Sequence, residues 1–201
     1  GPGNDLIILT SGNRIGGDIQ AGVGDSDQLV FQGDSSYTGL VNACEFLVRE
    51  TDGTSVLWLT ADPTFTQVSV ATGTLTMGRT DRSQPVTAAA VVVSGGTLNL
   101  QSPTFSDIVQ VSGGVLNVNN DLTLVDINDS LVLLAGEVNI RGGQTITQTL
   151  VVEGGTMTVR SNVLAATTQV NGGTLLANGQ LQSLTPLTVG EEGTLGGSGT
   201  I

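Results

Sequence analysis

The chain has 201 residues, of which 38% are hydrophobic, 12% are charged and 29 are glycine, a composition too apolar for a disordered segment. Eighteen acidic residues against six basic ones give a net charge of −12, which argues against nucleic acid and anionic membranes as partners, since both require a cationic surface. One cysteine and no histidine exclude an internal disulfide, a Ser-His-Asp triad and histidine-ligated metals.

The first 60 residues carry the weakest pattern. Residues 1–3 are expected to be a scar of tag removal, and residues 4–60 to form irregular N-terminal coils or a cap. A strand is predicted at 28–31 and a polar corner at 33–39, whereas 43–48 is compatible with one helical turn. Trp58, the only tryptophan, lies in an apolar strand at 56–59 and is expected to fill the core rather than bind a ligand.

Residues 61–201 are predicted to form regular coils of the same continuous domain, because one short sequence recurs along them. Its clearest copy is Val93-Ser94-Gly95-Gly96-Thr97-Leu98-Asn99-Leu100. The second glycine of each copy marks the period: Gly73, Gly96, Gly114, Gly136, Gly155, Gly173 and Gly193, at intervals of 18 to 23 residues. A repeat of this length indicates a solenoid.

Apolar and polar residues alternate on both sides of each glycine pair, as in strands that bury one face. One copy cannot bury its own apolar side, but stacked copies pair strand to strand about 4.8 Å apart along a common axis. The fold class is therefore all-β, a right-handed parallel β-helix (β-solenoid) of roughly ten coils of about 20 residues. Leu98, Leu116 and Val138 are predicted to lie directly above one another.

Two further features belong to particular coils. The segments Asp62-Pro63-Thr64-Phe65 and Ser102-Pro103-Thr104-Phe105 share a corner sequence, so Phe65 and Phe105 are predicted to be core rings at equivalent positions. An outward position holds asparagine in consecutive coils, at Asn99, Asn117 and Asn139, and predicts a hydrogen-bonded ladder along the axis. The pattern is still running at Ile201, so the β-helix is expected to be truncated there, with an open end that favours self-association.

Two stretches resemble autotransporter-associated β-strand repeats of bacteria. The first is Gly33-Asp34-Ser35-Ser36-Tyr37-Thr38-Gly39, and the second is Gly193-Thr194-Leu195-Gly196-Gly197-Ser198-Gly199-Thr200-Ile201. The resemblance implies a passenger domain of an autotransporter-like surface protein, located extracellularly at the bacterial cell surface after export through the outer membrane. It implies an architecture and a route of secretion, and it does not specify a biochemical activity.

The expected function is structural or adhesive, a stiff rod that displays loops to a host or neighbouring-cell protein or glycan. No catalytic, cofactor-binding or metal-ligating residue is predicted. Two alternatives remain open. A carbohydrate-active β-helix needs paired carboxylates, for which the candidates are Asp25 with Asp27, Asp126 with Asp129, and Glu191 with Glu192. A calcium-dependent assembly module would use Asp25 and Asp27 in a segment that resembles the calcium-binding nonapeptide of repeat toxins.

Overall fold

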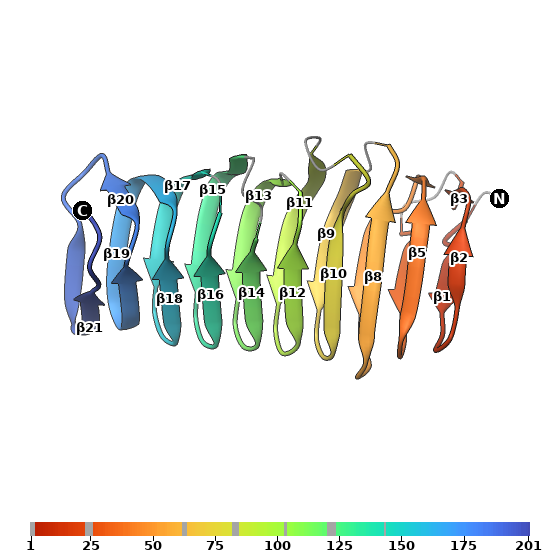
Figure 1. Ribbon diagram of the computed structural model, residues 1–201, viewed down its shortest axis with the longest axis horizontal. Helices are drawn as coiled ribbons and strands as arrows, with labels where there is room; N and C mark the ends of the chain where they lie inside the picture. Colours follow the sequence, from red (N-terminus) through yellow and green to blue (C-terminus); the bar gives the residue numbers. More distant parts are fainter. Residues whose placement is uncertain are drawn as a thin grey trace.

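The computed structural model describes residues 3–22, 26–61, 64–81, 85–102, 104–119, 124–142 and 144–201. These residues form strands joined by turns and contain no helix, and 19 of the strands belong to one parallel sheet. Figure 1 shows the strands stacked side by side along the long axis, with the two termini near opposite ends. The predicted β-solenoid is confirmed, with about nine turns of about 20 residues each. Its right-handed winding stays a prediction.

Each turn contributes to two long ladders, one on either side of the glycine corners. The ladder before the corners contains β1 (Leu6–Leu9), β4 (Gln28–Phe31), β7 (Phe46–Arg49), β9 (Thr64–Val70), β11 (Val86–Val93), β13 (Thr104–Val111), β15 (Leu124–Leu133), β17 (Gln144–Val152) and β19 (Asn162–Ala177). The ladder after them contains β2 (Arg14–Gly16), β5 (Ser35–Gly39), β8 (Thr54–Leu59), β10 (Thr74–Arg79), β12 (Thr97–Leu100), β14 (Val115–Val118), β16 (Glu137–Ile140), β18 (Thr156–Val159), the second half of β19 and β21 (Thr188–Gly196).

Three short strands complete the set. β3 (Ile19–Gln20) pairs with β6 (Val41–Asn42) in a separate two-stranded sheet, and β20 (Gln180–Ser183) pairs with the start of β19. The other N-terminal strands, β1, β2, β4, β5, β7 and β8, join the same large sheet as the regular coils. Among the described residues, no helix is long and apolar enough to cross a membrane.

The register of the second ladder confirms the central prediction. The aliphatic residue two positions after each glycine pairs with its equivalent in the next coil: Leu75, Leu98, Leu116, Val138, Met157, Leu175 and Leu195. All of these except Leu195 are buried. Equivalent aliphatic side chains therefore stack into one continuous core along the axis, which a single 20-residue coil has too little apolar surface to form.

The corners require glycine for two reasons. Gly114 has φ +69°, a backbone conformation that a Cβ atom disfavours. A Cβ atom there would also lie closer than 3.0 Å to the carbonyl oxygens of Gly95 and Gly96 in the preceding coil. Successive corners are packed backbone against backbone, so the glycine repeat reflects the close approach of adjacent coils.

Three predictions about single segments have different outcomes. Phe65 is 1% exposed, as expected for a core ring, whereas the side chain of Phe105 lies outside the described part of the chain. The helical turn considered for 43–48 is wrong, since Phe46–Arg49 is the strand β7 and pairs with both β4 and β9. The core position predicted for Trp58 is also wrong: Ser55, Leu57 and Leu59 point inward, and Trp58 lies half-buried on the outer side of β8.

The sequence reasoning did not anticipate a buried arginine in the core. Arg49 is fully buried in the inward row of the first ladder, paired with Phe31 on one side and Val70 on the other. Its Nη1 donates a hydrogen bond to the carbonyl of Phe31 at 3.0 Å, while Nε and Nη2 have no hydrogen-bond partner. Burial lowers the pKa of Arg49, and the nearby carboxylates of Asp34 and Asp52 oppose that shift.

Candidate functional site

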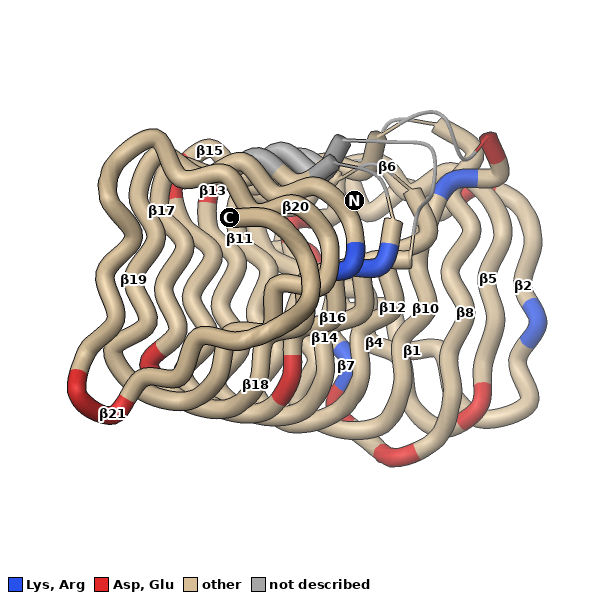
Figure 2. Tube along the Cα trace, turned by 60° about the vertical axis from the view of Figure 1, so that its left-hand side comes forward, with Lys and Arg blue, Asp and Glu red and all other residues tan. Residues whose placement is uncertain are grey.

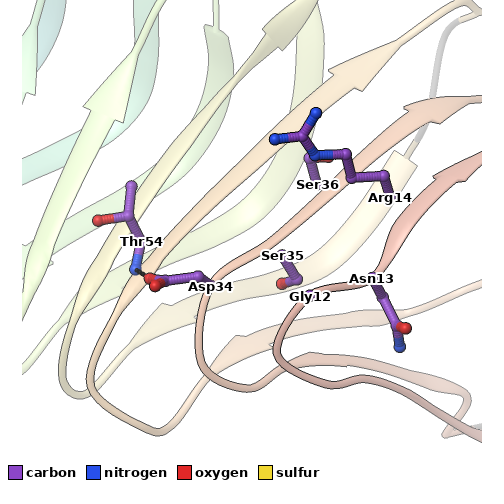
Figure 3. Close-up of a pocket in the computed structure, with 7 residues that line it drawn as sticks. All are labelled: Gly12, Asn13, Arg14, Asp34, Ser35, Ser36 and Thr54. Atoms are coloured by element: carbon purple, nitrogen blue, oxygen red, sulfur yellow. Dashed lines mark hydrogen bonds between the residues drawn. The ribbon is translucent and has the colours of Figure 1, made fainter.

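A shallow pocket of about 360 Å³ opens at the N-terminal end of the rod. It is lined by Gly12, Asn13, Arg14, Asp34, Ser35, Ser36 and Thr54, which come from the first corner, β2, β5 and the start of β8. Figure 3 shows the Arg14 side chain extending over Ser36, with Asp34 on the opposite side of the opening. The pocket therefore combines a guanidinium, a carboxylate and hydroxyl groups.

Hydrogen bonds between coils fix the walls of this pocket. The carboxylate of Asp34 accepts a hydrogen bond from the backbone N–H of Thr54 at 2.7 Å, and the carbonyl of Asp34 accepts one from Gly12 at 2.7 Å. Ser35 is buried, and its hydroxyl lies 2.9 Å from that of Ser55. Arg14, in contrast, is exposed and extends from a strand of only three residues. A rigid polar wall facing a cationic side chain can recognise a polar or anionic ligand.

Asparagine side chains form the predicted ladder on the outer side of the second sheet ladder. The Nδ2 of Asn117 donates to the Oδ1 of Asn99 at 2.8 Å, and the Nδ2 of Asn139 donates to the Oδ1 of Asn117 at 3.1 Å. The Nδ2 of Asn99 continues the row to the hydroxyl of Thr76 at 3.2 Å. We call these four residues, Thr76, Asn99, Asn117 and Asn139, the asparagine ladder. Each amide satisfies its neighbour, so the ladder ties consecutive coils together.

The acidic pair considered for calcium does not form an open site among the described residues. Asp27 is fully buried, its Oδ1 accepts a hydrogen bond from the Asp5 backbone N–H at 2.6 Å, and its own N–H donates to the Glu45 carboxylate at 2.8 Å. Asp25 lies outside the described part of the chain. No group of three or more cysteine, aspartate or glutamate side chains within the described residues is placed to hold a metal ion.

Besides Asp25 and Asp27, two pairs of carboxylates are candidates for glycan cleavage, and they lie in different coils. Glu191 and Glu192 are neighbouring exposed residues in β21. Asp129 is exposed on β15, and the side chain of Asp126 lies outside the described part of the chain. Glu191, Glu192 and Asp129 are all exposed to solvent.

Sequence reasoning missed one carboxylate near Asp129. The register between β13 and β15 shifts between Ser106 and Ile108, so that the corner of β13 at Asp107 faces the longer corner of β15 at Asn128 and Asp129. The Nδ2 of Asn128 donates to the Oδ1 of Asp107 at 3.1 Å. The preceding coil therefore contributes an acid, Asp107, beside Asn128 and Asp129, and the repeat does not reveal it because a shift of register is not visible in the sequence. All three side chains are exposed to solvent.

Two buried groups near the N-terminal end have structural partners. The Tyr37 hydroxyl lies 2.6 Å from the carbonyl of Gly17 and 2.7 Å from that of Leu40, and it accepts a hydrogen bond from the Ile19 N–H. Burial raises the pKa of Tyr37. Burial also raises the pKa of the Cys44 thiol to about 11, so Cys44 is a poor nucleophile at neutral pH.

Charged residues are unevenly distributed over the rod, as Figure 2 shows. Acidic residues occupy several corners of the rod. Two arginines, Arg141 and Arg160, directly follow the paired strands β16 and β18 and so lie on adjacent coils. Comparison with known protein families, with curated proteins and with solved structures finds no match for the chain.

Proposed function

We propose that the chain is a structural or adhesive passenger β-helix of a secreted bacterial surface protein, which displays side chains on a stiff rod and catalyses no reaction. The observation that supports this most strongly is the unbroken register of the second ladder from Leu75 to Leu195. A continuous core and a row of side-chain hydrogen bonds connect each coil to the coils on either side, which favours a rigid rod.

The resemblance to autotransporter-associated repeats supports the bacterial surface as the location, and the polar pocket at the N-terminal end supports a ligand-binding role. A glycan or a protein on a host or neighbouring cell is the proposed partner. End-to-end association is a further part of the proposal, and exposed apolar side chains such as Leu6 and Leu184 favour self-association.

Expression of the full-length gene product in its own bacterium tests the proposal. On intact cells, we expect an antibody raised against this chain to bind, and external protease to remove the epitope. Purified chain incubated with polysaccharides should leave their viscosity unchanged. An epitope that becomes accessible only after lysis, or a loss of viscosity abolished by Asp129→Asn, would contradict the proposal. Sedimentation at increasing protein concentration tests the end-to-end association.

A further inference from the structure

The position five residues after each corner glycine, or four after Gly12 in the first coil, forms a second outward row beside the asparagine ladder. The row contains Gly16, Thr38, Trp58, Gly78, Gln101, Asn119, Arg141, Arg160 and Asn178, and we call it the outer row. Beyond the paired strands, backbone hydrogen bonds keep it in register, because the N–H groups of Asn119, Arg141 and Arg160 each donate to the coil before. Its members are therefore about 4.8 Å apart along the axis.

The outer row and the row of the asparagine ladder carry no carboxylate. The latter row runs from Arg14 through Ser36, Val56, Thr76, Asn99, Asn117, Asn139 and Thr158 to Leu176. In a chain with 18 acidic residues, this leaves one continuous face without negative side chains in either row. The three exposed arginines among the described residues, Arg14, Arg141 and Arg160, all lie on it. The two rows are thus cationic on an acidic rod, while the Asp34 carboxylate that also lines the Arg14 pocket accepts a hydrogen bond from the Thr54 N–H.

Two of these arginines are neighbours without partners. Arg141 and Arg160 occupy consecutive positions of the outer row, and neither guanidinium group forms a hydrogen bond or ion pair with another residue that the structure describes. The pairing of Ile140 with Val159 just before them places the two on adjacent coils. Two guanidinium groups on adjacent coils repel each other, so an anionic group placed between them gains from both charges.

Trp58 provides an apolar contact on the same row. Its ring lies across the backbone of Gly78, since a Cβ atom on Gly78 would be 2.9 Å from Cζ3 of the indole. The residue on its other side in the row is Thr38, which is small and exposed. The half-buried indole is therefore held against the sheet rather than projecting from it. Such a rigid aromatic surface suits the C–H face of a sugar ring.

We propose that this face binds one linear anionic polysaccharide, which lies along the rod axis from the Arg14 pocket past Trp58 to Arg141 and Arg160. The inference rests on the proposed display function, because it names what the rod displays and to which class of ligand. The adjacent arginines Arg141 and Arg160 provide two cations on strands about 4.8 Å apart, which fits a chain with a regular, moderate charge spacing. Nucleic acid fits less well, since duplex DNA carries one charge per about 1.7 Å and demands a denser cationic surface. The neutral amides between the arginines and Trp58 supply hydrogen bonds to hydroxyl groups.

Binding of the purified chain to polygalacturonic acid, with dextran as the neutral comparison, tests the inference by affinity electrophoresis and calorimetry. The variant Arg141→Gln/Arg160→Gln is expected to bind polygalacturonic acid about tenfold more weakly, and binding of the unaltered chain should fall at high ionic strength. The control Gln148→Glu/Gln182→Glu changes the net charge by the same amount at exposed positions of β17 and β20, away from the face, and should keep most of the affinity. Circular dichroism verifies that each variant is folded.

Three outcomes overturn the inference: no binding by the unaltered chain, equal loss in the control, or tighter binding to dextran or to single-stranded DNA than to polygalacturonic acid. These outcomes would not contradict the β-helical rod or its proposed location at the cell surface. Shortening of polygalacturonic acid by the unaltered chain would instead contradict the display function, while the loss of binding in Arg141→Gln/Arg160→Gln would still support the face as the binding site.

Discussion

Three glycine-to-alanine substitutions separate the two reasons for which corners of this rod contain glycine. Gly12 has φ +82° with no atom within 4 Å of an added Cβ, so alanine there tests backbone strain alone. Gly95 does not have a positive φ, and a Cβ atom there would lie against the carbonyl oxygen of Ala71. Alanine at this position therefore tests the contact between coils. Gly114 combines both conditions, with φ +69° and two carbonyl oxygens of the coil before it.

The expected destabilisations follow from these local geometries. Gly12→Ala should lower the free energy of unfolding by about 1 kcal/mol, the cost of a left-handed conformation less the gain from a stiffer unfolded chain. Gly95→Ala should cost about 2–3 kcal/mol, because the backbone oxygen of Ala71 cannot rotate away as a side chain would. Gly114→Ala should cost about 3–5 kcal/mol, since strain and overlap act together.

Urea unfolding, followed by Trp58 fluorescence and by far-ultraviolet circular dichroism, measures the three variants against the unaltered chain. The midpoints should fall in the order Gly12→Ala, Gly95→Ala, Gly114→Ala, with similar dependence on urea concentration. If Gly114→Ala costs no more than Gly12→Ala, the close backbone contact between coils does not explain the glycine repeat, and the stacking argument is refuted.

Three further predictions concern single side chains. Arg49→Leu should raise the free energy of unfolding, measured by urea titration, by about 1–3 kcal/mol. The substitution replaces a buried, incompletely hydrogen-bonded guanidinium by an aliphatic group between Phe31 and Val70. A loss of stability would contradict this reasoning. Asn117→Leu should lower it by about 1–3 kcal/mol through loss of both ladder hydrogen bonds, and an unchanged midpoint would show that the asparagine ladder contributes nothing. Cys44, with its pKa raised to about 11, should resist iodoacetamide at pH 8 as measured by mass spectrometry until urea unfolds the chain. The folded state holds the thiol proton more tightly than the unfolded state does. The contribution of Cys44 to stability should therefore be full below about pH 9 and fall as the pH rises toward 11. Labelling of the folded chain at pH 8 would contradict the burial of the thiol.

The sequence alone determined the architecture, because a solenoid repeats its physical constraints at every coil. The interval between glycines is enough to place Leu98, Leu116 and Val138 in one stack and Asn99, Asn117 and Asn139 in one ladder. Counting five residues from Gly53 likewise assigns Trp58 to the outside of the rod. The run of apolar residues at 56–59, however, obscured the alternation of inward and outward side chains. The same count also assigns Arg141 and Arg160 to the outer row, five residues after Gly136 and Gly155.

The tertiary structure alone decided what happens where a coil departs from the period. The corner between Arg49 and Gly53 is one residue longer than that between Val70 and Gly73. Counting back from Gly53 would therefore assign the inward position to Glu50. The pairing with Val70 instead places Arg49 in the core. The shift of register beside Asp107 is of the same kind. A local insertion changes which side chain faces inward, and only the pairing of that coil with its neighbours determines how the chain accommodates it.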